Sequence, residues 1–337
     1  MIFPDARTRV PTPAFSAETI RTLKRRAYKT AAVELSAHPQ SNFSFLRPPG
    51  WKVGPPLIHT RAPMPMQALA SFTRKHPSVF MDMLTYSPTY DCLPGDFLDA
   101  HLDGLLMSHR SEGPLGDGWY ADRMGRYGRG DCILAGHRKG KELYLFLCAV
   151  SEGAFSRVRD EVLAIVATFT LRNKNVLPYA ERWRRYASHK LGLSFALPLG
   201  VTIQNDNRGV AARWHQPEGN IDFSVRPARR LERDFSQIEA GFRQDLLRRG
   251  IRLGPPRVGD LPASSTGIFS GAVSIRLYES LACTPPALES LLMVGTRTDG
   301  RTVRVMGTYP SREADRDMWM RARFAFVQIA ATMRALN

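Results

Sequence analysis

The sequence predicts an α+β protein built from two similar units in tandem, each an antiparallel sheet flanked by helices. Three observations predict this fold: the chain is long enough for two domains, a strand-and-turn motif occurs twice, and the same order of elements follows each copy. The chain has 337 residues, of which 43% are hydrophobic and 23% are charged. This composition is ordinary for globular proteins, so each half can bury a core of its own.

A strand that ends in a Pro-x-Gly turn occurs once in each half. Its residues in the first half are repeated at one constant offset in the second: Ser44, Phe45, Pro48 and Gly50 match Ser194, Phe195, Pro198 and Gly200. Proline fixes φ and glycine permits positive φ. The pattern therefore predicts the same chain reversal after both strands.

Each half continues with an amphipathic helix and then a hairpin. One side of a helix is formed at helical spacing by Phe97, Leu98, His101, Leu102, Leu105 and Leu106, all apolar except the histidine, and again by Phe235, Ile238, Phe242, Leu246 and Leu247. The hairpin strands are Cys132–Ala135 and Leu143–Ala149 around a Gly136–Lys141 turn, and Leu291–Val294 and Val303–Met306 around a Gly295–Arg301 turn. Two glycines in each turn suit a tight reversal between strands.

Both halves close with a helix. The apolar stripes are Phe155, Val158, Val162, Ile165 and Phe169 in the first half, and Trp319, Ala322, Phe326, Ile329 and Met333 in the second. The two helices end alike, in Ala167-Thr168-Phe169 and Ala331-Thr332-Met333. Four elements in the same order, with matching residues at both ends, favour a duplication over chance similarity.

These elements divide the chain into four segments. They are an extension at 1–40 with a basic helix expected from Ser16 to Ser36, a first unit at 41–171, a linker at 172–190 with a short basic helix expected over Ala180–His189, and a second unit at 191–337. The linker is expected to be semi-rigid because of its helix.

The segments Phe45–Trp51 and Ala167–Phe169 resemble the PsbP/Mog-like fold, including its bacterial DcrB-like group. The resemblance implies an antiparallel sheet, a helix in the middle of the domain and a C-terminal helix. The second unit departs from the pattern, because Val201 replaces the tryptophan and Met333 the final phenylalanine. Its assignment therefore depends on the internal repeat.

Members of that group without a signal peptide are similar to the Eag-type chaperones of type VI secretion. Such chaperones are homodimers that shield apolar N-terminal helices of secreted effectors, and a tandem chain resembles two protomers fused into one monomer. The first ten residues include Asp5, Arg7 and Arg9 and no apolar core. We therefore expect a cytoplasmic adaptor or chaperone, or alternatively a structural subunit of the secretion apparatus.

Binding an apolar helix would require apolar side chains on a sheet face that the helices leave bare. Alternating residues that could supply such a face are Val79, Met81 and Met83 in the first unit and Ile221, Phe223 and Val225 in the second. Methionine suits adaptable binding surfaces, and Met64 and Met66 lie nearby in the sequence. The alternative interpretation is that these residues simply form the core.

The net charge of +16, from 47 basic and 31 acidic residues, favours acidic partners. The basic residues that we expect on the surface are Arg25, Arg26 and Lys29 in the extension and Arg182, Arg184 and Arg185 in the linker. A nucleic acid or an anionic surface is therefore the second hypothesis for the partner, with an affinity that falls steeply with salt.

Common catalytic and cofactor motifs are absent from the sequence, so we expect no catalytic residue, metal or cofactor. The glycine-rich segment Gly125–Asp131 could cradle an anion, although a loop before the hairpin is the simpler interpretation. Asp99, His101 and Asp103 cannot share one site on a helix, because positions two apart point in different directions. His59, His76 and His137 have polar neighbours typical of loops.

Overall fold

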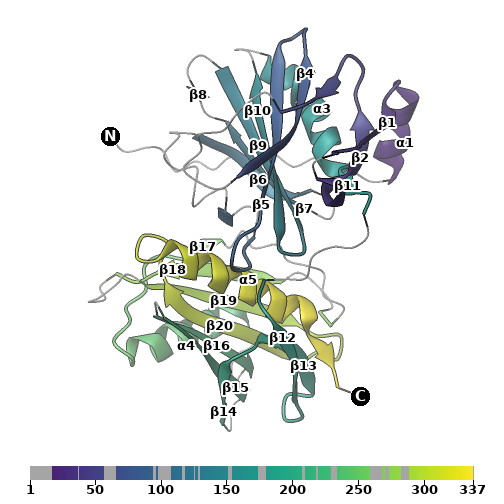
Figure 1. Ribbon diagram of the computed structural model, residues 1–337. Helices are drawn as coiled ribbons and strands as arrows, with labels where there is room; N and C mark the ends of the chain where they lie inside the picture. Colours follow the sequence, from purple (N-terminus) through teal and green to yellow (C-terminus); the bar gives the residue numbers. More distant parts are fainter. Residues whose placement is uncertain are drawn as a thin grey trace. The chain divides into compact units, whose positions relative to one another are not determined.

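The computed structural model shows a mixed α+β protein with mostly antiparallel sheets, divided into two compact units at 1–180 and 181–337 (Figure 1). The predicted α+β class is confirmed. The structure describes residues 17–36, 38–56, 66–93, 96–97, 108–115, 118–124, 126–127, 130–150, 154–173, 180–206, 209–217, 219–228, 234–258, 268–269, 273–281 and 288–336. No helix among these residues combines the length and the apolar content needed to cross a bilayer.

Unit 1 has a small and a large sheet. Its elements are α1 Ala17–Arg25, β1 Lys29–Val33, the short 3-10 helix η1 Pro39–Ser41, β2 Phe43–Arg47, β3 Lys52–Gly54, β4 Gln67–Arg74, β5 Val79–Tyr86, β6 Ser108–Leu115, β7 Gly118–Met124, β8 Arg126–Tyr127, β9 Gly130–Lys139, β10 Glu142–Val150, α3 Phe155–Ala167 and β11 Thr170–Leu171. The small sheet has the order β1-β2-β11, the large one β3-β4-β5-β10-β9-β8, and β6 pairs with β7.

The core of unit 1 is an aromatic cluster between the sheets and α3. Phe43 and Phe45 of β2 lie within 6.1 Å and 5.1 Å of Phe72, measured between ring centroids. Phe169, just after α3, contacts Phe43 and Phe146, each at 5.4 Å. The alternation of β2 turns both of its phenylalanines inward, because successive side chains of a strand point to opposite faces.

Unit 2 repeats this arrangement. Its elements are β12 Trp183–Ser188, β13 Leu193–Pro198, β14 Val201–Asp206, β15 Gly209–Gln216, β16 Gly219–Pro227, α4 Phe235–Leu247, β17 Arg257–Val258, β18 Ser274–Glu279, β19 Leu288–Thr296, β20 Thr302–Pro310, α5 Arg316–Thr332 and β21 Arg334–Ala335. Each long helix begins at an aspartate cap: Asp234 accepts from the N–H of Gln237 and Asp315 from that of Met318, both at 2.9 Å.

The two units share one sheet topology. The small sheet of unit 2 has the order β12-β13-β21, matching β1-β2-β11. The large sheet runs β14-β15-β16-β20-β19, matching β3-β4-β5-β10-β9, and continues with β18 and β17. The turn glycines also agree, with φ of 81° at Gly50 and 87° at Gly200. Similar sequences at both ends of each unit therefore correspond to similar folds.

One hydrogen-bond arrangement is identical in the two units. The hydroxyl of Thr168 accepts from the N–H of Leu46 at 2.8 Å and donates to the carbonyl of Ala164 at 2.6 Å. The hydroxyl of Thr332 accepts from the N–H of Ala196 at 2.8 Å and donates to the carbonyl of Gln328 at 2.6 Å. Each threonine thus joins the end of the closing helix to the second strand of the small sheet, which explains why the motif occurs twice.

Thr168→Val and Thr332→Val are each expected to lower the free energy of unfolding by about 1 kcal/mol, the net contribution of a typical hydrogen bond. Valine keeps the size and branching of threonine and removes only the hydroxyl. Hydrogen exchange of the Leu46 and Ala196 amides would measure the effect unit by unit. Thr170→Val, an exposed position in β11, is the control and should change little. Equal losses in all three variants would contradict the proposed role.

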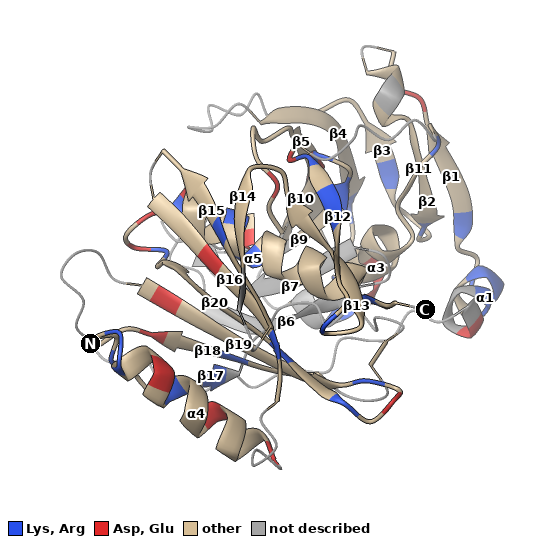
Figure 2. Ribbon diagram, turned by 90° about the horizontal axis from the view of Figure 1, so that it is seen from below, with Lys and Arg blue, Asp and Glu red and all other residues tan. Residues whose placement is uncertain are grey.

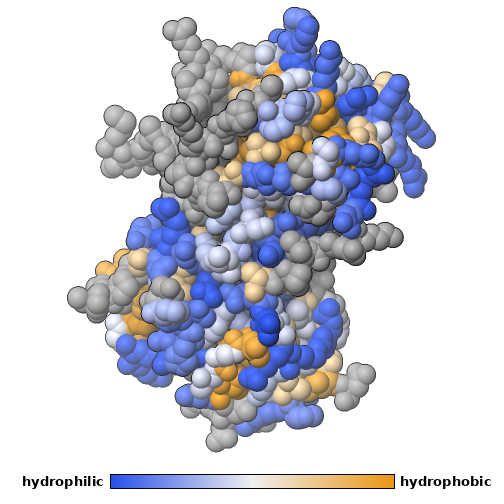
Figure 3. All heavy atoms as spheres, viewed as in Figure 1, coloured by the Kyte–Doolittle hydropathy of each residue, from blue (hydrophilic) through white to orange (hydrophobic). Residues whose placement is uncertain are grey.

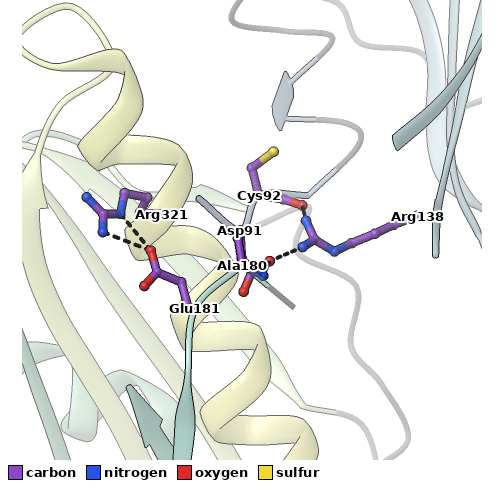
Figure 4. A network of polar contacts seen from close by, with 6 residues as sticks. All are labelled: Asp91, Cys92, Arg138, Ala180, Glu181 and Arg321. Carbon is purple, nitrogen blue, oxygen red and sulfur yellow. Dashed lines mark hydrogen bonds and ion pairs between the residues drawn. The ribbon is translucent and has the colours of Figure 1, made fainter. Parts of the chain in front are cut away.

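The residues at the boundary between the units are each held within their own unit (Figure 4). The N–H of Ala180 donates to the carboxylate of Asp91 at 2.9 Å, and the guanidinium of Arg138 donates to the same carboxylate. On the other side, Arg321 donates twice to Glu181, at 2.8 and 3.1 Å. The boundary lies inside the segment predicted to be a linker.

Two helix predictions are wrong in whole or in part. The helix expected from Ser16 to Ser36 ends at Arg25, Ala27 adopts a left-handed φ of 66°, and the chain continues as β1. The helix expected over Ala180–His189 is the strand β12, which pairs with β13 along its whole length. In both segments, pairing with the next strand of the small sheet overrides the local helical spacing.

The predicted hairpins and the three described long helices are confirmed. In unit 1 the strands run closer to the turn than expected, and Gly140 with φ of 61° makes the reversal from β9 to β10. β19 and β20 form the second hairpin. The helix expected over 97–106 lies, beyond Phe97, outside the described residues.

Candidate functional site

A groove of about 630 Å³ lies in unit 1 between the edge of the small sheet and the edge of the large one. Its walls come from β1 and the residues after it, from the end of β3, and from β4. The lining residues are Ala31, Ala32, Val33, Glu34, Leu35, Ser36, His38, Arg47, Val53, Gly54, Pro55, Pro56, Ala68 and Leu69. We call this groove the edge groove. Its volume lies within the range of typical ligand sites.

The edge groove exists because β3 is short. β3 pairs with β4 only from Lys52 to Gly54, and Pro55 and Pro56 follow. Proline has no N–H to donate to a strand ladder, so the strand ends there. Among the described residues, positions 67–70 of β4 consequently have no strand partner on that side.

Unit 2 has no such gap at the equivalent place. β14 pairs with β15 continuously, from Val201 opposite Trp214 to Asp206 opposite Gly209. The edge strand there is six residues long and carries no proline. Within the described parts of the chain, the two units thus differ at this edge of the large sheet, where 67–70 of unit 1 have no strand partner.

The floor of the edge groove is apolar. Ala31 and Val33 of β1 and Leu35, two residues after the strand ends, lie at alternating positions, are half-buried, and pack with Val53 on the core of unit 1. Leu69 is buried beneath them. Charged side chains at the rim are the exposed Glu34 and Arg47. Apolar (orange) residues interrupt the hydrophilic surface of unit 1 in the space-filling view (Figure 3).

The residues predicted to form a bare apolar face lie in the core instead, which corrects that prediction. Val79, Met81, Met83, Ile221, Phe223 and Val225 are all at most 3% exposed. The methionines pack beneath α3 in the core of unit 1, and the Phe223 ring lies 5.1 Å from that of Phe326 in α5. In each unit the closing helix covers this face. The alternative interpretation, that these residues form the core, is therefore correct.

The opposite face of β16 lines a second cavity, of about 290 Å³, between the sheet and α4. It presents Asp222, Ser224 and Arg226, one position out of step with the predicted residues. Because side chains alternate along a strand, an error of one position exchanges the two faces. Arg213 on β15 donates to both carboxylate oxygens of Asp222, at 2.7 and 3.0 Å. This face is polar, and therefore unsuited to an apolar helix.

The corresponding strand of unit 1 carries a buried carboxyl on its second face. Asp82 of β5 is 1% exposed and accepts a hydrogen bond from Ser71 of β4. Burial raises the pKa of this carboxyl, and the hydrogen bond from Ser71 lowers it by less. A carboxyl in such surroundings tends toward its neutral form.

The six predicted basic residues, Arg25, Arg26, Lys29, Arg182, Arg184 and Arg185, are all exposed. In unit 1 they lie on α1, in the turn after it and at the start of β1; in unit 2 they lie on or next to β12. Since β1 and β12 occupy the same place in the two small sheets, the two basic segments of the sequence are structural equivalents.

His137 is not in a loop, contrary to the prediction. It lies in β9, is 2% exposed, and its Nε2 makes a hydrogen bond with the carbonyl of Val166 at 2.5 Å. His76 is exposed in the turn between β4 and β5. The predicted residues His59, Met64, Asp99, His101 and Asp103 lie outside the described residues. Of the glycine-rich segment, 126–127 form β8 and pair with 130–131 at the start of β9.

A cysteine thiol with a shifted pKa lies elsewhere in unit 1, but it is buried. Burial raises the pKa of the Cys92 thiol to about 12, so the sulfur stays protonated at neutral pH. Within the described part of the chain, no three His, Cys, Asp or Glu side chains are placed to hold a metal ion together.

A buried polar network lies in unit 2 around Glu289 of β19, which is 3% exposed. Its carboxylate accepts from the hydroxyl of Tyr309 at 2.6 Å and from the indole N–H of Trp319 at 3.2 Å. Arg323, itself 3% exposed, lies 3.8 Å from the same oxygen, and Arg257 donates to the other oxygen at 3.2 Å. Burial raises the pKa of Glu289, and the arginines and hydrogen bonds oppose that shift. We assign this network to the stability of unit 2.

No known protein family matches this chain, and no curated protein matches it either. Its function therefore has to be argued from its own residues. Of the two cavities described, the edge groove is the larger, and alanine, valine, leucine and proline make up most of its lining residues. Sequence reasoning missed it, although Pro55-Pro56 after a short strand and the alternation of Ala31, Val33 and Leu35 are signals that could have located it.

Proposed function

We propose that the protein is a non-enzymatic adaptor or chaperone that holds an apolar segment of a secreted effector. In this proposal both units are PsbP/Mog-like, and the chain is a tandem counterpart of an Eag-type chaperone. The observation that carries the proposal is the edge groove, whose apolar floor lies beside an edge of β4 that has no strand partner among the described residues. The shared topology of the two units supports a duplication.

The proposed occupant is an extended segment rather than a helix. An added strand would pair with the backbone of β4 at 67–70, in the place where β3 stops. Main-chain hydrogen bonds give such a complex affinity, and pockets for alternate side chains give it specificity. Ala31, Val33 and Leu35 would contact every second side chain of the segment, since side chains alternate with a period of two.

Val53→Glu is expected to weaken effector binding at least about tenfold, equivalent to about 1.4 kcal/mol, because it places a charge in the apolar groove. The probe is a fluorescent peptide copied from the apolar N-terminal segment of an effector encoded beside this protein, and anisotropy reports binding to the full chain. Hydrogen exchange should also show new protection of the amides at 67–70.

Ile203→Glu is the matched control. Ile203 is half-buried in β14, at the position of unit 2 that corresponds to Val53 in β3. It should leave peptide binding unchanged. Equal losses in both variants, or no binding of any neighbouring effector segment to the unmodified protein, would refute the proposal.

A further inference from the structure

Several arginines of unit 2 are paired with carboxylates, but those of its small sheet are not. The paired ones are Arg213 with Asp222, Arg243 with Glu239, Arg248 with Asp245, Arg297 with Asp299 and Arg321 with Glu181. By contrast, Arg182, Arg184, Arg185 and Arg334 are exposed and form no ion pair with any described carboxylate. Positive charge on this sheet is therefore not neutralised within the described chain.

Two of these arginines flank one serine. Arg185 on β12 lies opposite Ala196, and Arg334 on β21 lies opposite Ser194, on either side of β13. Residues opposite each other across a sheet share a face, as do residues two apart on one strand, so both arginines lie on the same face, roughly 10 Å apart across β13. The guanidinium of Arg185 donates to the Ser194 hydroxyl at 2.9 Å, and that of Arg334 to the carbonyl of Met333 at 2.6 Å.

The equivalent sheet of unit 1 also carries positive charge, on the face that corresponds to Arg184 rather than to Arg185. Lys29 on β1 lies directly opposite Arg47 on β2, both are exposed, and neither forms an ion pair with a described carboxylate. Arg25 and Arg26 shortly precede this strand, and Figure 2 shows the basic residues of α1 and β1 in blue. Like charges directly opposite in a sheet are destabilising. A bound anion would relieve that repulsion.

We infer that the two small sheets form a pair of basic patches that bind the phosphate backbone of nucleic acid, one patch on each unit. The patches are the exposed face around Arg185 and Arg334 in unit 2 and around Lys29 and Arg47 in unit 1. Guanidinium groups match phosphate geometry, and a net charge of +16 favours polyanions. The unit 1 patch shares Arg47 with the rim of the edge groove, whereas the unit 2 patch shares no residue with it, so the unit 2 variant tests this binding separately from the proposed chaperone function.

The aromatic residues of β12 indicate which part of the nucleic acid is contacted. Trp183 packs against Phe324, at 6.1 Å between ring centroids, and Tyr186 against Phe195 at 5.7 Å. These rings are half-buried and engaged within unit 2. They are therefore not free to stack on bases, as readers of single strands require. The patches contact backbone phosphates, with little dependence on base sequence.

The test measures binding of the full chain to a fluorescent 30-base-pair DNA duplex of random sequence, as a function of salt. Arg185→Gln/Arg334→Gln and Lys29→Gln/Arg47→Gln are each expected to weaken binding at least about tenfold. Each should also reduce the steepness of the salt dependence, by roughly 0.9 in log–log slope for every phosphate that the variant no longer neutralises.

Arg213→Gln/Arg248→Gln is the control, because it removes the same charge from exposed residues that are already paired with carboxylates. It should weaken binding less than about threefold, because removing two positive charges only slightly reduces the long-range attraction between the protein and DNA. Equal losses in the control would show that only net charge matters and would overturn the inference. Undetectable DNA binding, or stronger binding to polyglutamate or to phosphatidylserine vesicles than to DNA, would overturn it too.

Discussion

Glu289→Ala is expected to lower the stability of unit 2 by about 3–5 kcal/mol, the usual effect of removing one partner from a buried charged group. Alanine leaves the hydroxyl of Tyr309 and the indole N–H of Trp319 without their acceptor, and it leaves Arg323 buried without its nearby carboxylate. Hydrogen exchange of amides in β19 and β20 would measure this loss, since these strands hold Glu289 and Tyr309. Exchange reports the free energy of opening unit by unit in the full chain.

Arg257→Ala is the matched control in the same network. The side chain of Arg257 is 47% exposed, so its ion pairs with Glu279 and Glu289 are screened by water. Exposed pairs contribute about 1 kcal/mol or less, and the control should lose no more than that. If Glu289→Ala lost as little as the control, the network would not be a determinant of the stability of unit 2.

Glu289→Gln separates the charge from the hydrogen bonds. Burial raises the pKa of Glu289 in the folded unit above the ordinary glutamate value near 4.3. In the pH interval between these two values, the folded state binds more protons than the unfolded state, so stability falls as the pH rises through it. Glutamine cannot titrate, and the variant should lack this decrease. An identical pH dependence of β19 exchange in both proteins would contradict the assignment.

The repeated order of elements could be predicted from the sequence because its signals are local. The Pro-x-Gly turn needs only a fixed φ and a glycine, and the closing helices show their apolar stripes within one segment. Thr168 and Thr332 were visible as matching residues, while their role as links to β2 and β13 became visible only in the structure. A hydrogen bond between residues this distant in sequence leaves no local pattern.

The strands β1 and β12 could not be predicted in the same way. Several arginines and lysines precede β1, and others lie within β12. Their spacings suit an exposed helix, so the sequence predicts helices there. Their strand state depends on pairing with β2 and β13, which lie later in the chain. Strand formation depends on such partners more than on intrinsic preference. The two errors occurred at equivalent positions, as expected for repeated units.

The predicted binding residues were assigned to the wrong face of their strands, because the face that they form is covered by a helix. Alternation in Ile221, Phe223 and Val225 correctly indicates one apolar face, but it does not say which face a helix covers. In the structure the closing helix covers the apolar face, and the polar face with Asp222 and Ser224 borders the cavity beside α4. The edge groove depends on where β3 stops relative to β4. This is set by the register of the two strands, which cannot be deduced from composition.

Gly307→Ala is expected to destabilise unit 2 by about 3 kcal/mol, at the upper end of the usual range for overpacking a core. A Cβ at position 307 would overlap the ring of Phe326. That ring is 1% exposed and cannot move aside, because it also packs against Phe223 at 5.1 Å and Tyr309 at 5.7 Å. The thermal unfolding midpoint and β20 hydrogen exchange would both measure the loss.

Gly54→Ala is the control, because a Cβ at this glycine of β3 meets no atom within 4 Å and its φ is not left-handed. It should change stability by less than about 1 kcal/mol. Phe326→Leu shortens the side chain at the site of overlap and should restore part of the stability that Gly307→Ala removes, so that the two changes couple by about 0.5–3 kcal/mol. A double variant no more stable than Gly307→Ala would show that the packing of α5 on β20 is not the cause. That packing also turns the apolar face of the sheet inward, so this face is covered within unit 2.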